Sequence, residues 1–239
     1  MIEQQKIIDF YDDYIGYQVR VGINERIYGL YRRMIRLGLN KRSRVLELGC
    51  GIGSLTRLLA HCIKQGSIEA VDISPESVAY AGDHLSNAHT RFVTADIVRY
   101  TPTLKNIDFI TLFDVLEHVP LSLHPALLNN LLKACTPQTK ILINIPNPDS
   151  LVYDIEQGSE GLQIIDQPVV ISTFIKDADQ AGLKLDFFET YDIWHKNDYT
   201  FIQLSPRSTF EKTDLASRRS LFQKAVKKMQ RIYFRTRYR

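Results

Sequence analysis

The chain has 239 residues, of which 44% are hydrophobic and 24% are charged, a composition typical of a globular protein with an ordinary core. This length suits one α/β domain with additions. No apolar stretch approaches the length that spans a bilayer, and the first residues lack the apolar core of a signal peptide. The three cysteines have no metal-ligand spacing, so we expect a reduced, cytoplasmic protein.

The net charge of +3 is unevenly distributed along the chain. Residues 207–239 hold 11 Lys or Arg and 2 acids, which gives this basic tail a charge of +9 and leaves −6 for the rest. Such an asymmetry is informative about partners and says nothing about fold. We therefore divide the chain into an N-terminal helical cap (1–40), a central domain (41–206) and the basic tail (207–239).

In chain order, apolar residues at helical spacing predict helices over residues 3–37, and Gly38 is a plausible stop. Strands and helices then alternate. The expected strands are 44–48, 68–72, 91–93, 107–113 and 140–145, and the expected helices are 54–63, the segment capped by Ser74, and 125–134. Near-continuous apolar runs separated by helices are typical of a parallel sheet that is buried on both faces.

The remaining part of the central domain follows a different pattern. Residues 147–167 show no clear periodicity, and we expect a long loop there, of the kind that is often functional. A helix over 172–181 precedes two strands, 184–193 and 198–204. Because the connection between these strands is short, they should be antiparallel.

The most informative segment is 45–54, where an apolar run contains Glu47 and leads into a glycine-rich turn. Glycine permits tight turns and close approach of a ligand to the backbone. Asp72 ends the next apolar run about 20 residues later, where an acid can accept hydrogen bonds from two ribose hydroxyls. These features predict a cofactor that contains adenosine. A dinucleotide is the alternative, although its fingerprint needs glycine where Ser54 stands.

Four motifs in order resemble the class I S-adenosylmethionine methyltransferases across residues 41–206: Glu47–Gly53, Val71–Ser74, Ala95–Ile97 and Phe113–Val119. The resemblance implies a Rossmann-like α/β fold. Its seven-stranded, mostly parallel sheet would end in an antiparallel hairpin, with an N-terminal helical cap and a C-terminal basic helix added. It also implies S-adenosyl-L-methionine as cofactor and S-adenosyl-L-homocysteine as product.

The same resemblance implies which residues bind this cofactor. Those near the methionine and ribose would be Glu47, Gly49, Cys50, Gly51, Gly53 and Asp72, and those near adenine or the end of the fourth strand would be Ile73, Asp96, Ile97 and Phe113. Residues 11–14 look like the lid segment of small-molecule and sugar methyltransferases, in which a tyrosine, here Tyr11, touches the cofactor. Arg26 would face the methionyl carboxylate. Packing or surface roles are the alternatives for Tyr11 and Arg26.

His118 is the candidate catalytic residue, because it follows the fourth strand at the edge where acceptor and cofactor should meet. A histidine there can act as general base for a hydroxyl acceptor. A capping or packing role is the alternative. Asp114, Glu117 and His118 also resemble the metal-binding pattern of the ubiquinone-pathway O-methyltransferases. However, Asp stands where that pattern has Glu, and we expect no metal.

The basic tail carries an apolar stripe at helical spacing, beginning at Leu221 and ending at Tyr233. Such a helix can pack on its own protein, lie on an anionic membrane through residues 217–235, or bind RNA phosphates. We expect a methyltransferase acting on an oxygen of a small molecule, a sugar or a lipid-linked glycan. An RNA methyltransferase and a non-catalytic module that binds the cofactor are the alternatives.

Overall fold

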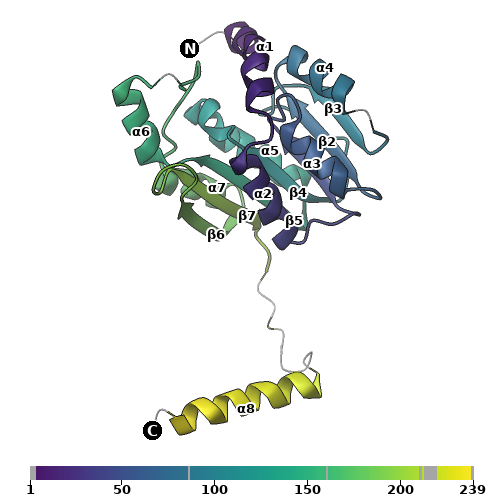
Figure 1. The fold of residues 1–239 in the computed structure, drawn as a ribbon, viewed down its shortest axis with the longest axis vertical. Coiled ribbons are helices and arrows are strands. Elements are labelled where there is room, and N and C mark those ends of the chain that lie inside the picture. The colour runs from purple at the N-terminus through teal and green to yellow at the C-terminus, as the bar shows by residue number, and fades with distance from the viewer. Residues whose placement is uncertain (1–3, 86, 160, 210–211, 213–219, 238–239) are drawn as a thin grey trace. The chain divides into compact units, whose positions relative to one another are not determined.

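The computed structural model describes residues 4–85, 87–159, 161–209, 212 and 220–237. The chain divides into two compact units, residues 1–207 and 208–239. The first unit is built on a seven-stranded sheet with the order β3-β2-β1-β4-β5-β7-β6 (Figure 1). Its strands are β1 (Arg44–Leu48), β2 (Ser67–Asp72), β3 (Thr90–Thr94), β4 (Ile107–Phe113), β5 (Cys135–Pro146), β6 (Leu183–Tyr191) and β7 (Tyr199–Pro206).

The pairing of the strands confirms the predicted fold class. Strands β1 to β5 are parallel to one another, whereas β7 is antiparallel to both β5 and β6. The strand order reverses between β1 and β4: β2 and β3 extend the sheet on one side of β1, and the later strands extend it on the other. In open α/β sheets, ligands bind at the carboxyl ends of the strands beside such a switch point.

Helices cover both faces of the sheet (Figure 1). The helices of the first unit are α1 (Gln4–Val21), α2 (Glu25–Arg36), α3 (Ser54–Cys62), α4 (Pro75–His84), α5 (His124–Ala134), α6 (Pro148–Gln157) and α7 (Ile171–Gln180). Two short 3₁₀ helices, η1 (Leu116–His118) and η2 (Leu121–Leu123), follow β4. One core joins α5 and α7 to the sheet, and a second core joins α2 and α3 to it.

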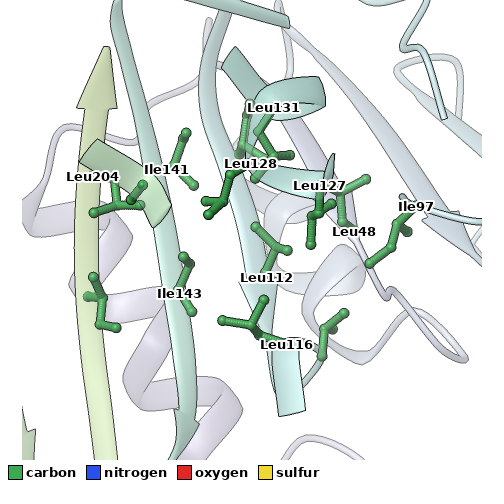
Figure 2. Close-up of a cluster of buried hydrophobic side chains, with 14 of the residues drawn as sticks. Leu48, Ile97, Leu112, Leu116, Leu127, Leu128, Leu131, Ile141, Ile143 and Leu204 are labelled. Atoms are coloured by element: carbon green, nitrogen blue, oxygen red, sulfur yellow. The ribbon is translucent and has the colours of Figure 1, made fainter. Parts of the chain in front are cut away.

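Figure 2 shows the first of these cores, in which leucines of α5 point toward apolar side chains of β4, β5 and β7. Leu128 is 1% exposed, and Leu112, Ile141 and Leu204 are completely buried. The strands are apolar on both faces because helices cover both faces, as the continuous apolar runs predict. This packing holds the carboxyl ends of β1 and β4 in place.

Two expectations about connections are wrong. Residues 148–157 form α6 and not a loop; the Asn147 side chain accepts a hydrogen bond from the Asp149 N–H, and Gly158 ends the helix with φ +64°. The strands are also not all linked by helices, because residues 95–106 connect β3 to β4 without one. Helix α6 was difficult to predict because only Leu151 on it is buried, which leaves little apolar periodicity.

The second unit contains α8 (Leu221–Arg237). Part of the basic tail lies outside the described residues, including the start of segment 217–235. No helix in the described part of the chain is long and apolar enough to cross a membrane.

Candidate active site at the carboxyl edge of the sheet

The glycine-rich turn is tied to the end of β2 by backbone hydrogen bonds. The N–H groups of Gly49 and Cys50 donate to the carbonyl of Val71 at 2.8 and 3.0 Å. The Gly51 N–H donates to Asp72 Oδ2 at 2.7 Å, and the Ser74 N–H donates to Asp72 Oδ1 at 3.0 Å. The two motifs that are most informative in the sequence are therefore joined through one carboxylate.

Glycine is required at two positions of this turn for reasons of conformation, and at one of them also for reasons of space. Gly49 has φ +77°, and a Cβ added there would lie 2.1 Å from a methyl group of Val115. Gly53 has φ +82°, and an added Cβ would lie 2.6 Å from Leu85 Cδ1. Positive φ strains a side chain at both positions, and at Gly49 the Val115 methyl group also leaves no room for one. The turn can thus pack directly against the segment after β4.

At this edge Glu47 is buried and Asp72 is half-buried, and both have little compensating positive charge. Glu47 is 3% exposed and accepts a hydrogen bond from the Thr56 hydroxyl at 2.7 Å. Burial raises the pKa of Glu47 to about 8, although the Thr56 hydrogen bond opposes the shift. Burial also raises the pKa of Asp72, against the hydrogen bonds from Ser74 and Gly51. Carboxylates in such a position favour a ligand that carries positive charge.

The residues predicted to surround adenine lie at the ends of β2 and β3. The Ala95 N–H donates to the Asp72 carbonyl at 2.8 Å, which brings the two strand ends together. Asp96 Oδ1 accepts from the Val98 N–H at 2.9 Å, Ile97 is 9% exposed, and Ile73 is half-buried. The structure thus places an acid and apolar side chains at neighbouring strand ends, and their contact with adenine stays a prediction.

Helix α1 lies over this edge and beside α4 (Figure 1). The Asp12 carboxylate accepts a hydrogen bond from the Ser74 hydroxyl at the start of α4. The side chain of Gln18 lies over Gly51, since a Cβ at Gly51 would come within 2.9 Å of it. The Tyr11 ring lies 6.3 Å from the His118 ring, and burial together with Asp72, Glu117 and Asp166 raises the pKa of Tyr11.

His118 is the last residue of η1, immediately after β4. Its Nδ1 lies 2.6 Å from the carbonyl oxygen of Ile165 and 3.2 Å from Asp166 Oδ1. An Nδ1–H that donates to these oxygens leaves Nε2 as the basic nitrogen. Burial alone would lower the pKa of His118, but the negative charges of Glu117 and Asp166 raise it to about 9.

Arg26, in the first turn of α2, forms an ion pair with Asp114, the residue that follows β4. Arg26 Nε is 3.0 Å from Asp114 Oδ2, and its guanidinium also donates to the Tyr199 hydroxyl. The same group lies 5.4 Å from the ring centres of Trp194 and Tyr199. Arg26 was expected to face the methionyl carboxylate. In the structure its guanidinium instead interacts with the Asp114 carboxylate and two aromatic rings. Phe113, the last residue of β4 and the residue before Asp114, is half-buried and lies opposite Asn144 of β5 in the sheet.

The metal pattern at Asp114, Glu117 and His118 does not form a ligand set. Asp114 pairs with Arg26, and His118 Nε2 is 3.8 Å from Glu117 Oε1. Within the described ranges, no three His, Cys, Asp or Glu side chains are grouped in a way that could hold a metal ion.

The sequence matches the model of a methyltransferase domain family over residues 23–213, which is most of the chain. The chain belongs to this family. The four motifs that resemble class I S-adenosylmethionine-dependent methyltransferases therefore predict the family correctly. The match includes the glycine-rich turn, Asp72, Asp96 and His118, and begins after α1.

Several known proteins are similar to this chain. A trans-aconitate 2-methyltransferase of Mycobacterium tuberculosis is 35% identical over 116 residues, which cover 48% of this chain and 42% of the relative. A malonyl-[acyl-carrier protein] O-methyltransferase of Acetivibrio thermocellus is 30% identical over 82 residues, 34% of this chain and 29% of the relative. The alignments thus span less than half the length of these curated relatives. A DhpI–SAH complex structure shares the fold, with a TM-score of 0.65 and 20% identity, covering 86% of this chain and 98% of that one.

The candidate site contains residues that sequence reasoning did not identify. Asp166 and Ile165 reach His118 from the segment after α6, and Gln18 reaches Gly51 from α1. Glu117 Oε2 and Gln18 Oε1 are buried without a hydrogen-bond partner in the part of the chain that the structure describes. No motif marks Asp166, Ile165 or Gln18, because their role depends on contacts between distant segments.

Proposed function

We propose that this protein transfers a methyl group from S-adenosylmethionine to an oxygen atom of a small molecule. The observation that carries the proposal is the pair of acids, the buried Glu47 and the half-buried Asp72, beside the glycine-rich turn. When bound, the cofactor supplies a methyl group on a cationic sulfonium, and it also carries an ammonium group. Both charges suit an edge where burial raises the pKa values of two carboxyl groups.

Residues of this chain have distinct roles in the proposed site. Asp72 would accept hydrogen bonds from ribose hydroxyls with its remaining lone pairs, because a carboxylate offers about four acceptor positions. Glu47 would accept from the ammonium group. Tyr11 and Gln18 of α1 would cover the bound cofactor and exclude water. In-line methyl transfer profits from this arrangement, since it depends on positioning and on a dry site.

His118 would act as general base toward a hydroxyl acceptor. Asp166 and the Ile165 carbonyl hold the ring by Nδ1, so that Nε2 is available to accept a proton. The pKa of about 9 leaves the ring mostly charged at neutral pH, and a positive charge brought into the site would lower that pKa. A neutral acceptor fits the charge balance, because Asp114 pairs with Arg26 while Glu117 and Asp166 face His118.

A carboxylate acceptor is the second candidate, favoured by the relatives. The trans-aconitate 2-methyltransferase and the malonyl-[acyl-carrier protein] O-methyltransferase are both named for acceptors that carry carboxyl groups. A carboxylate is already ionised and needs no base. It would instead depend on a charged His118, so the two candidates predict opposite responses to pH.

Calorimetric titration of S-adenosylmethionine and S-adenosylhomocysteine tests the cofactor. We expect micromolar binding of both and a loss of about a hundredfold in Asp72→Ala, because two hydrogen bonds to a charged group disappear. Asp108→Ala is the matched control, since Asp108 accepts from the Arg44 N–H at the opposite edge of the same sheet. Absence of binding to the wild-type protein, or equal affinities of the two variants, would overturn the proposal.

A further inference from the structure

Helix α8 has two chemically distinct sides. With about 3.6 residues per turn, the apolar stripe occupies an arc of about 140° around the helix. It consists of Leu221, Phe222, Ala225, Val226, Met229, Ile232 and Tyr233. Five cationic residues, Lys224, Lys227, Lys228, Arg231 and Arg235, occupy a separate arc of about 100°. Asp and Glu are absent from the sequence of the helix.

The start of this helix is encoded locally. The Ser220 N–H donates to Gln223 Oε1, and the Gln223 N–H donates to Ser220 Oγ, both at 3.2 Å. This reciprocal pair is a capping box, which satisfies backbone donors that the first turn leaves without partners. The amphipathic helix therefore begins at a position set by its own residues.

The apolar side is largely open to solvent. Phe222 is 77% exposed and Met229 is 67% exposed. Large apolar side chains in this arrangement stabilise a helix only when something covers them. The covering surface must also be compatible with the neighbouring row of cations.

We propose that α8 lies in the surface of an anionic lipid bilayer, with Phe222 and Met229 inserted among the acyl chains and the lysines at the headgroups. Charge complementarity favours an anionic surface as the partner, because the tail carries +9. The cytoplasmic leaflet of cell membranes is rich in acidic lipids. An RNA would satisfy the cations and leave the apolar arc exposed, since phosphate contacts require no apolar face.

Vesicle binding by the 239-residue chain tests this proposal. Sedimentation would compare vesicles of pure phosphatidylcholine with vesicles made of equal masses of phosphatidylcholine and phosphatidylglycerol. We expect at least about tenfold tighter binding to the anionic vesicles, with added salt weakening it only in part. A residual, salt-resistant component distinguishes inserted side chains from a purely electrostatic attachment.

Two neighbouring residues provide a matched pair of variants. Met229→Asp and Gln230→Asp change the charge equally, but only the first lies in the apolar arc. We expect Met229→Asp to weaken binding to anionic vesicles about tenfold more than Gln230→Asp. Replacing Lys227 and Lys228 by Gln should weaken binding to anionic vesicles and leave the weak binding to phosphatidylcholine unchanged. The affinity for S-adenosylmethionine, the methyl donor, should be the same in all variants. Equal affinities would show that the first unit remains folded.

Other results would overturn the proposal. Equal losses in Met229→Asp and Gln230→Asp would show that the apolar side does not insert. Absence of vesicle binding, with the wild-type protein instead retained on single-stranded RNA in a salt-dependent manner, would assign the tail to nucleic acid. Concentration-dependent self-association that Met229→Asp abolishes, without vesicle binding, would assign the apolar side to a second copy of the chain. None of these results depends on the methyltransferase reaction.

Discussion

His118 Nδ1 lies 3.2 Å from Asp166 Oδ1, although the two residues come from segments that flank β5 and α6. Asp166 Oδ2 also accepts a hydrogen bond from the Gln163 N–H, which fixes the orientation of the carboxylate. A carboxylate held in this way orients the imidazole and increases its basicity. The segment after α6 thus determines the chemistry of a residue that follows β4.

Replacing Asp166 by Asn should change the pH dependence of methyl transfer. Because the charge of Asp166 helps to raise the pKa of His118 to about 9, its removal lowers that pKa. If neutral His118 is the base, kcat/KM rises with pH up to this pKa, and the rise should shift about one pH unit toward acid in Asp166→Asn. The measurement is a pH profile of both proteins with the same hydroxyl acceptor.

The controls for this profile separate the possible roles of His118. His118→Gln should abolish the pH-dependent rise and retain donor affinity. A rate that is reduced equally at every pH in Asp166→Asn would mean that Asp166 only supports the loop. A wild-type rate that falls as the pH passes through 9 would indicate that a charged His118 is needed, as for a carboxylate acceptor.

The glycine turn and Asp72 could be predicted from the sequence because each motif is local. An apolar strand, a glycine turn and an acid follow one another within a few residues, and the sheet then places Asp72 beside Gly51. The Asp166–His118 contact could not be predicted. It depends on the path of the chain after α6, and no spacing rule links two residues across an intervening strand and helix. Helix α6 had capping signals at Asn147 and Gly158, but its apolar pattern was weak.

Two buried glutamates on adjacent strands should respond differently to replacement by Gln. Glu47 accepts one side-chain hydrogen bond from the described residues, from the Thr56 hydroxyl, whereas Glu69 accepts hydrogen bonds from Tyr100 and from the backbone and side chain of Thr103. The folded-state pKa of Glu47, about 8, lies above the unfolded value of about 4.3, so this group costs stability increasingly as the pH rises from 4 to 8.

Glu47→Gln should therefore raise the free energy of unfolding above pH 8, on the order of 1–3 kcal/mol, and should weaken donor binding. Glu69→Gln should lower the free energy of unfolding, because it breaks a satisfied network, and should leave donor affinity unchanged. Urea unfolding at pH 5 and at pH 8.5, together with calorimetry, checks both results. Stabilisation of Glu47→Gln that is equal at the two pH values would contradict the assignment to ionisation.

Gly49→Ala should destabilise the protein and distort the site. The added methyl group meets Val115 at 2.1 Å and forces a positive φ on alanine, so we expect a loss of about 2–4 kcal/mol in the free energy of unfolding. Gly16→Ala is the matched control, because Gly16 lies within α1 with nothing inside 4 Å of an added Cβ. It should be neutral or stabilising by up to about 1 kcal/mol. Thermal unfolding of both variants measures the difference, and equal effects would argue against a close packing of the turn.

Asp12→Ala should accelerate the exchange of the bound donor. The Asp12 carboxylate accepts a hydrogen bond from the Ser74 hydroxyl and lies 3.4 Å from the Glu76 N–H, at the positive end of α4. Because this contact holds α1 over the glycine turn, its loss should raise the dissociation rate of the donor about tenfold. Stopped-flow displacement measures that rate, and amide hydrogen exchange along α1 should increase in parallel. Asp13→Ala removes the same charge from an exposed neighbouring position and should change neither quantity. If both variants release the donor at the wild-type rate, α1 is held closed by its apolar contacts, and the Asp12–Ser74 hydrogen bond has no part in retaining the cofactor.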